Sequence, residues 1–327
     1  MRELDLIAAI EAALATEGRP RVLRGPGDDA AVVAADPIAV TSVDAMVEGV
    51  HFNLETHSHA DAGHRAMAAA LSDLAAMGAR PGEAYVALAL PESTRRADAL
   101  ALVEAMEALA RRKAVTIAGG DVTTGPVLMV SVTVTGWAAS ERELAYRDGA
   151  GIGDAVGVTG ALGGSSAGLL LLRADGAGLD APTHDALVSR HRRPEPLIEL
   201  GRSLAAGGAS AMIDVSDGVA TDAGHLARRS GLAIEIGLAR LPLDSGVEAV
   251  ARSAGRDAAD LAASGGEDFE LLVCAPPEAV AALERAADAH ERPLTWIGAA
   301  TSGAGLVLRR DDGSVAELSG YEHGDQR

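Results

Sequence analysis

The sequence predicts an α/β (α+β) protein with two mixed-sheet domains. Its 327 residues exceed the usual size of one hydrophobic core. Apolar runs of strand length alternate with segments of helical periodicity along the whole chain. A polar, glycine-bearing segment, residues 138–153, interrupts this alternation and marks a boundary. We therefore expect an N-terminal domain at residues 1–137 and a C-terminal domain at residues 138–327.

The N-terminal domain is expected to begin with an amphipathic helix in residues 1–18, which has no pattern of a secretory signal. Runs of β-branched and aliphatic residues between turns rich in Gly, Pro and Asp then predict strands. The predicted strands are 21–23, 30–34, 38–43, 84–90, 114–118 and 127–136, and the predicted helices are 59–77 and 94–113.

The C-terminal domain repeats the mixture of strands and helices. The predicted strands are 155–159, 209–215, 232–236, 270–275, 294–297 and 306–309, and the predicted helices include 165–174, segments within 183–207, 219–229 and 276–290.

Composition limits what the protein binds. Hydrophobic residues make up 48% of the chain and aromatic residues 2%, so the cores must be built from aliphatic side chains. The net charge of -19 disfavours nucleic acid and anionic membranes as partners. No apolar run reaches the ~18 residues of a membrane-spanning helix. The single cysteine, Cys274, lies in an apolar run, which predicts a buried thiol and fits a cytoplasmic protein.

Residues 214–218, Asp-Val-Ser-Asp-Gly, form the most informative stretch. They follow a predicted buried strand and precede a predicted helix, which is a common place for ligands. Asp214, Ser216 and Asp217 offer hard oxygen ligands of the kind that Mg²⁺ prefers. The alternative is that Ser216 or Asp217 only caps the helix.

Acidic side chains recur at the ends of other elements. Asp28 and Asp29 occupy a turn, Ser42 and Asp44 lie on one side of a strand, and Asp121 follows two glycines after another strand. Asp73 lies on the apolar face of its helix, where an uncompensated carboxylate would cost several kcal/mol, so a cation or strong donors should contact it. A buried, hydrogen-bonded aspartate is the alternative there. The pattern as a whole predicts metal ions in a cleft.

Other phosphate-handling and nucleophilic sites have no support. Lys113 is the only lysine and lies in no P-loop context, which rules out the P-loop and protein-kinase arrangements. A Ser-His-Asp or Cys-His site is not indicated either.

Seven motifs together resemble one family. They are GPGDDAAV, TSVDAMVEGVHF, LSDLAAMGARP, AGGDVT, YRDGAGIGD, IDVSDGVATD and SGGEDFEL, in this order over nearly the whole chain. The set resembles the thiamine-monophosphate kinase family, which is similar in fold to aminoimidazole ribonucleotide synthetase and selenophosphate synthetase. The resemblance implies two α/β domains, a homodimer paired through the N-terminal sheets, and transfer of the γ-phosphoryl of ATP to thiamine monophosphate.

The resemblance also implies the roles of individual residues. Several Mg²⁺ ions would be held by Asp29, Ser42, Asp44, Asp73, Asp121, Asp214 and Asp217. ATP would contact Gly120, Asp121, Arg147 and Ser216, and thiamine monophosphate would contact His51, Glu267 and Tyr321. Val43 departs from the family, which often has threonine there. Because the acceptor phosphate is already ionised, transfer would be direct and in-line, without a general base.

Three alternatives remain open from the sequence. One is another ATP-using enzyme of the superfamily, selenophosphate-synthetase-like or amidine-forming. Another is a nucleotide-binding maturation scaffold. The third is a non-enzymatic acidic protein that binds Mg²⁺ or Ca²⁺.

Overall fold

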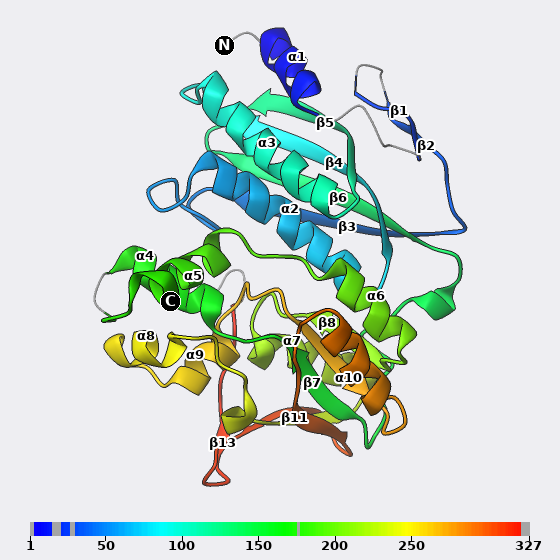
Figure 1. Ribbon diagram of the computed structural model, residues 1–327, viewed down its shortest axis with the longest axis vertical. Helices are drawn as coiled ribbons and strands as arrows, with labels where there is room; N and C mark the ends of the chain where they lie inside the picture. Colours follow the sequence, from blue (N-terminus) through cyan, green and yellow to red (C-terminus); the bar gives the residue numbers. More distant parts are fainter. Residues whose placement is uncertain (1–2, 15–20, 27–29, 175–176, 322–327) are drawn as a thin grey trace. The chain divides into compact units, whose positions relative to one another are not determined.

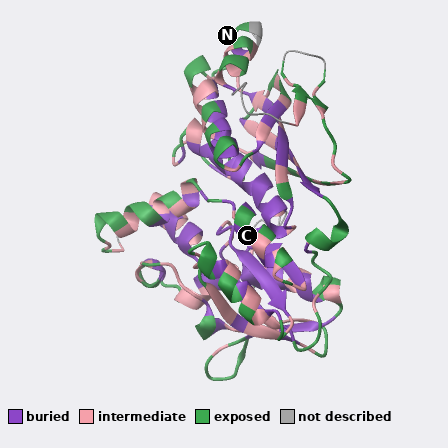
Figure 2. Cartoon of the chain, turned by 45° about the vertical axis from the view of Figure 1, so that its right-hand side comes forward, coloured by how far each residue is buried: buried purple, intermediate pink, exposed green. Residues whose placement is uncertain are grey.

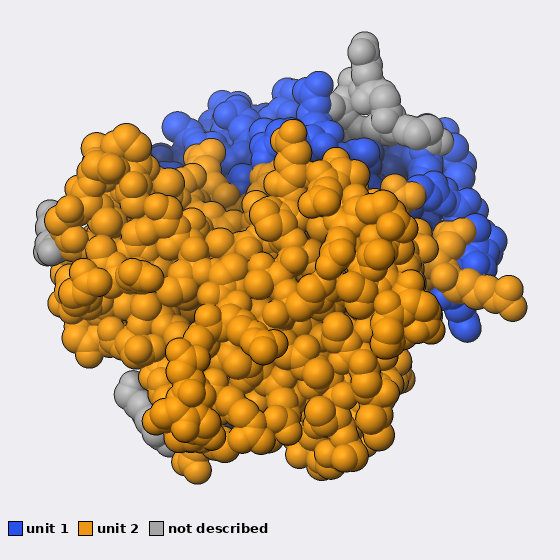
Figure 3. All heavy atoms as spheres, turned by 60° about the horizontal axis from the view of Figure 1, so that its bottom comes forward, with its two compact units in different colours: residues 1–74, 79–141 blue, residues 75–78, 142–327 orange. Residues whose placement is uncertain are grey.

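The computed structural model describes residues 3–14, 21–26, 30–174 and 177–321. The chain divides into two compact units (Figures 1 and 3). Unit 1 contains residues 1–74 and 79–141, and unit 2 contains residues 75–78 and 142–327. Both units contain a sheet and helices, so the prediction of a mixed α/β fold with two sheet-containing domains is confirmed.

Unit 1 is built on a four-stranded sheet of order β3-β6-β4-β5, in which β4 and β5 are parallel and the other pairs are antiparallel. Strands β1 and β2 form a separate antiparallel pair. The elements are α1 (Glu3–Ala13), β1 (Val22–Arg24), β2 (Val32–Val33), β3 (Ile38–Val47), α2 (His59–Ala76), β4 (Arg80–Leu90), α3 (Arg96–Arg112), β5 (Thr116–Thr124) and β6 (Met129–Ala138).

Alternation along the central strand β6 divides the sheet of unit 1 into two faces. Val130, Val132 and Val134 are fully buried, whereas their neighbours Ser131 and Thr133 are partly exposed. Side chains two apart on a strand point to the same face, so one face is covered and the other is open. Helix α2 is almost entirely buried (Figure 2). Its many alanines suit this burial because they let neighbouring backbones approach closely.

Unit 2 contains a seven-stranded sheet of order β13-β12-β9-β11-β7-β10-β8. Strand β12 pairs with β9 in parallel, and the other pairs are antiparallel. The strands are β7 (Ala155–Thr159), β8 (Ala211–Asp214), β9 (Ala233–Gly237), β10 (Leu271–Ala275), β11 (Leu294–Thr301), β12 (Gly305–Arg309) and β13 (Val315–Ala316). The helices are α4 (Gly164–Arg173), α5 (Ala181–Arg192), α6 (Ile198–Ala206), α7 (Val219–Ser230), α8 (Val247–Ser253), α9 (Ala258–Ser264) and α10 (Val280–Ala289).

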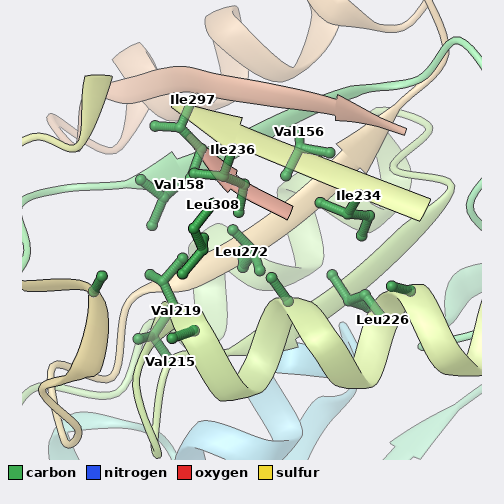
Figure 4. Close-up of a cluster of buried hydrophobic side chains, with 14 of the residues drawn as sticks. Val156, Val158, Val215, Val219, Leu226, Ile234, Ile236, Leu272, Ile297 and Leu308 are labelled. Carbon is green, nitrogen blue, oxygen red and sulfur yellow. The ribbon is translucent and has the colours of Figure 1, made fainter. Parts of the chain in front are cut away.

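The main core of unit 2 lies between helix α7 and the sheet. Val219 and Leu226 of α7 point toward Val156, Ile234 and Leu272 of the strands, and all five are at most 4% exposed (Figure 4). The cluster is aliphatic, as the low aromatic content requires. It fixes the position of α7, and the residues before α7 form the turn with the aspartates.

The structure changes several predicted element boundaries. Strand β3 continues to Val47, and β5 continues to Thr124, so Gly120 and Asp121 lie inside a strand and do not follow it. Strand β4 begins at Arg80, because Arg80 and Pro81 already pair with β6, and a register shift follows between Pro81 and Glu83. Among the described residues, no helix is long and apolar enough to cross a membrane.

Candidate active site

In unit 1 the hydroxyl of Ser42 donates a hydrogen bond to the carboxylate of Asp73, which joins β3 to α2. Asp73 is partly buried among fully buried neighbours such as Ala70 and Leu74. The sequence predicted a cation or strong donors at Asp73, and the hydroxyl of Ser42 is such a donor. Asp44 follows Ser42 by two residues on the same face of β3, and its Oδ1 accepts the backbone N–H of Ala45 at 2.8 Å.

Val43 lies on the other face of β3. It pairs with Thr133 of β6 and is 65% exposed, whereas Ser42 pairs with the fully buried Val134. The Val43 side chain therefore points away from the face that carries Ser42 and Asp44. Valine in place of the family's usual threonine at position 43 therefore does not change Ser42 and Asp44, the candidate oxygen ligands on the other face.

Asp121 is not brought together with Ser42, Asp44 and Asp73. It is exposed on β5 and pairs with the exposed Ala87, so it lies on the open face of the sheet. Strands β3 and β5 are the two edges of this sheet, three strand spacings or roughly 14 Å apart. Within unit 1, Asp121 and Asp44 are too far apart to bind one ion directly.

The glycine before Asp121 has a packing role of its own. A Cβ at position 120 would lie 2.1 Å from the carbonyl oxygen of Val86 on β4, so only glycine fits. The Gly-Gly-Asp pattern is thus partly explained by close strand packing, whether or not Gly120 contacts a nucleotide.

His51 lies in the turn that follows β3. Its Nδ1 accepts the backbone N–H of Val47 at 3.1 Å, so the neutral ring carries its proton on Nε2. Arg65 Nη2 donates to the carbonyl of His51 at 3.3 Å. The turn is therefore held by its own backbone and by α2, with Nε2 of His51 as a donor.

In unit 2 the predicted metal-binding turn connects β8 to α7. Asp214 ends β8 and is 2% exposed. The N-cap position of α7 is Gly218, so neither Ser216 nor Asp217 caps the helix, and the simple capping interpretation is wrong. The backbone N–H groups of Ser216 and Asp217 both donate to Oδ2 of Asp222, each at 3.1 Å.

Asp222 was not predicted from the sequence, and its position makes the site strongly acidic. It is 2% exposed in the first turn of α7. Burial, and then the negative charges of Asp214 and Asp217, raise the pKa of Asp222 to about 8. The negative charges of Asp214 and Asp217 therefore lie close enough to Asp222 to disfavour its ionised form.

The metal-ligand set is not complete in any one place that the structure describes. Asp29 lies outside the described residues. Among the rest, no three His, Cys, Asp or Glu side chains are grouped as a metal site. The predicted ligands instead lie in three places: Ser42, Asp44 and Asp73 in unit 1, Asp121 apart from them on β5, and Asp214 and Asp217 in unit 2.

Two other predicted contacts of unit 2, Glu267 and Tyr321, lie at the same turn. The backbone N–H of Glu267 donates to the carbonyl of Ser216 at 2.8 Å, and that of Tyr321 donates to the carbonyl of Asp217 at 3.0 Å. Backbone hydrogen bonds thus bring together residues of two motifs and of the C-terminal segment, where Tyr321 is 48% exposed.

The backbone of Arg147 lies at the other end of α7, and the charge of Arg147 acts on His225 within that helix. The carbonyl of Arg147 accepts the hydroxyl of Ser230 at 3.1 Å, at the C-terminal end of α7. Because α7 has 12 residues, this end is roughly 18 Å from the turn that contains Ser216. The structure therefore does not bring the backbone of Arg147 to that turn.

Comparisons with known proteins show the family of the chain. Residues 27–138 match the model of the AIR synthase related protein N-terminal domain, and residues 151–311 match that of its C-terminal domain. A thiamine-monophosphate kinase of Rhodopirellula baltica is 36% identical over 324 residues, which cover 95% of this chain and 94% of the relative. The chain belongs to the thiamine-monophosphate kinase family.

Solved structures of the thiamine-monophosphate kinase family have the same fold. The enzyme of Stenotrophomonas maltophilia has a TM-score of 0.84 and 36% identity, covering 97% of this chain and 98% of that one. A structure of AaThiL complexed with AMPPCP and TMP has a TM-score of 0.77 and 31% identity, covering 87% of each chain. The resemblance inferred from the seven motifs is therefore confirmed, and the chain is a member of a family of enzymes.

Proposed function

We propose that this protein transfers the γ-phosphoryl group of ATP to thiamine monophosphate, giving ADP and thiamine diphosphate. The observation that carries the proposal is the hydrogen-bonded cluster of unit 2, in which the Asp214–Asp217 turn, Glu267 and Tyr321 are joined through their backbones. An acidic turn suited to metal-bound phosphates then adjoins a carboxylate and an aromatic ring suited to a cationic heterocycle. The related complex with AMPPCP and TMP supports the same pair of ligands.

Mg²⁺ is the metal that these residues fit. Asp29, Ser42, Asp44, Asp73, Asp121, Asp214 and Asp217 would hold several ions. The ions would neutralise the phosphates in a chain of net charge -19 and so permit two anionic substrates to approach each other. Gly120, Asp121, Arg147 and Ser216 would contact ATP.

The residues of the chain would act by positioning and charge, without a general base. The acceptor is a phosphate oxygen that is already ionised at neutral pH. It would attack the γ-phosphorus of ATP in line, and the bond from that phosphorus to the β,γ-bridging oxygen would break as ADP leaves. His51 would donate its Nε2 proton in a hydrogen bond to the thiamine phosphate, and Glu267 and Tyr321 would contact the thiamine rings.

The active form would be a homodimer paired through the open face of the unit 1 sheet. That face carries Val43, which is 65% exposed, together with the outward side chains of β6. An exposed aliphatic side chain on the open face of a sheet is consistent with coverage by another surface.

A direct assay tests the proposal. Purified protein is incubated with ATP, Mg²⁺ and thiamine monophosphate, and thiamine diphosphate and ADP are quantified by chromatography. We expect equal amounts of both products, loss of turnover with excess EDTA, and no comparable turnover of free thiamine, whose alcohol would need a base. ATP hydrolysis without thiamine diphosphate, or turnover only with selenide or an amide substrate, would assign the protein to another branch of the superfamily.

A further inference from the structure

The loop that contains Glu267 has an unusual backbone. It joins α9 to β10, and Glu267 and Phe269 have φ angles of 66° and 50°. Side chains with a Cβ disfavour this left-handed region by about 1 kcal/mol or more per residue. Two such residues on either side of Asp268 require surroundings that fix the loop firmly.

Backbone hydrogen bonds fix one side of the loop. The N–H of Glu267 donates to the carbonyl of Ser216 at 2.8 Å, and the N–H of Phe269 donates to the carbonyl of Val215 at 2.9 Å. These bonds tie the loop to the acidic turn between β8 and α7.

The carboxylate of Asp268 fixes the loop to a different element. Its Oδ2 accepts the N–H of Gly163 at 2.6 Å, and its Oδ1 accepts the N–H of Ser165 at 3.0 Å, both at the start of α4. Asp268 is only 4% exposed. A buried carboxylate with two backbone donors and a helix N-terminus is a strong anchor because each bond is charge-assisted.

Ser165 also links the anchor to the side chain of Glu267. The Ser165 hydroxyl lies 3.0 Å from Nδ1 of His191 on α5, and the same Nδ1 lies 3.7 Å from Oε2 of Glu267. Ser165 and His191 are each 1% exposed, whereas the Glu267 side chain is 29% exposed. The buried pair of Ser165 and His191 therefore lies beside the partly exposed carboxylate of Glu267.

We infer that Asp268 and His191 are positioning residues for the acceptor site, which hold the backbone and the carboxylate of Glu267 where the thiamine rings bind. This inference rests on the proposed function and adds two residues to it. Neither residue touches a substrate in this assignment. Both act through Glu267.

The test compares Michaelis constants for the two substrates at pH 8. In Asp268→Asn one carboxylate oxygen becomes an NH₂ group, so one of the two backbone N–H groups loses its acceptor. We expect the KM for thiamine monophosphate to rise about tenfold or more, because small displacements of a binding group are costly, while the KM for ATP changes less than about twofold.

Asp154→Asn is the matched control. Asp154 is also a buried aspartate of unit 2 (5% exposed), and it accepts a backbone N–H from Gly151 at 2.8 Å and the hydroxyl of Ser210. Asp154→Asn should lower the melting temperature, but it should not raise the KM for thiamine monophosphate more than the KM for ATP. If Asp268→Asn behaves like Asp154→Asn, Asp268 has only a structural role and the inference is wrong.

His191 provides a second test that does not depend on Asp268→Asn folding. His191→Phe removes the polar atom beside Glu267, whereas His191→Asn keeps an amide near the position of Nδ1. We expect His191→Phe to raise the KM for thiamine monophosphate selectively and His191→Asn to restore much of the loss. Equal effects of both variants on ATP and thiamine monophosphate would overturn the role of His191. Failure of the wild-type protein to phosphorylate thiamine monophosphate would instead overturn the proposed function.

Discussion

The backbone N–H of Tyr321 donates to the carbonyl of Asp217 at 3.0 Å, which fixes the end of the described chain against the acidic turn. Gly320 permits this contact, since a Cβ there would lie 1.8 Å from the same carbonyl oxygen. The Gly320 N–H also donates to the hydroxyl of Thr221 at 2.9 Å. The tail is therefore placed by specific bonds, and the aromatic ring that it carries remains about half exposed.

This placement predicts a selective effect of replacing Tyr321. In Tyr321→Ala the ring that would stack on thiamine is lost, so the KM for thiamine monophosphate should rise about tenfold and the KM for ATP should change little. Tyr321→Phe keeps the ring and should retain most of the affinity. Steady-state kinetics with each substrate varied separately provides the measurement. Equal effects on both substrates would remove Tyr321 from the acceptor site.

The sequence predicted the helices and strands of this site better than the hydrogen bonds that join them. Period-two and helical patterns located β3, β8 and α7, and an aspartate on an apolar helix face correctly indicated a partner for Asp73. Asp222 and Asp268 were missed as anchors. Both side chains accept hydrogen bonds from backbone N–H groups. Every residue except proline has such a group, so the amino-acid sequence does not show which aspartates have these partners.

The position of Asp121 shows another limit of the sequence. The glycines before it suggested the end of a strand, but they are compatible with a strand where a neighbouring backbone approaches closely. Which face of the sheet a residue occupies depends on register, and an extra residue of β5, Ala118, opposite the step from Ala84 to Tyr85 shifts that register. Sequence alone did not reveal that Asp121 and Asp44 lie on opposite faces.

Metal dependence is tested by replacing ligands one at a time. Asp73→Asn and Asp217→Asn should each lower kcat by about 100-fold or more, because a neutral amide holds Mg²⁺ poorly and leaves phosphate charge uncompensated. Higher Mg²⁺ should recover part of the loss. Asp312→Asn is the control, because Oδ1 of this aspartate accepts the backbone N–H and the hydroxyl of Ser314 within its own turn. Full turnover in both ligand variants would contradict the metal assignment.

Asp268 should also affect how stability depends on pH. Burial raises its pKa to about 6, against the lowering effects of Arg190 and the two backbone donors. The pKa of Asp268 in the folded state lies above its unfolded value of 3.8, so between these two pKa values the folded state binds more protons than the unfolded state. The contribution of Asp268 to the free energy of unfolding therefore falls as pH rises from about 4 to 6. We compare the free energy of unfolding of the wild type with that of Asp268→Asn. The wild-type value minus the variant value should fall by up to about 3 kcal/mol between pH 4 and pH 7. Urea titrations at several pH values measure it, and a flat difference would contradict the assignment.

Dimer formation through the open sheet face predicts sensitivity at Val43. Val43→Asp places a charge on that face, so it should shift the protein from dimer to monomer at micromolar concentration. Val315→Asp is the matched control, since Val315 is 58% exposed on β13 of unit 2. Sedimentation velocity distinguishes the two states. A monomeric wild-type protein, or a dimer that tolerates Val43→Asp, would disprove this interface.

Cys274 should be dispensable for catalysis. It lies on β10 between β7 and β8 and is fully buried. Burial, followed by the charge of Asp154, raises the pKa of its thiol to about 12, so almost no reactive thiolate exists at pH 8. Iodoacetamide should therefore label the protein only after unfolding, which mass spectrometry can measure. Cys274→Ala should keep its turnover and lose about 1 to 2 kcal/mol of stability from the small cavity. A well-folded Cys274→Ala protein without activity would show that the reaction uses a thiol and that phosphoryl transfer by positioned residues alone is wrong.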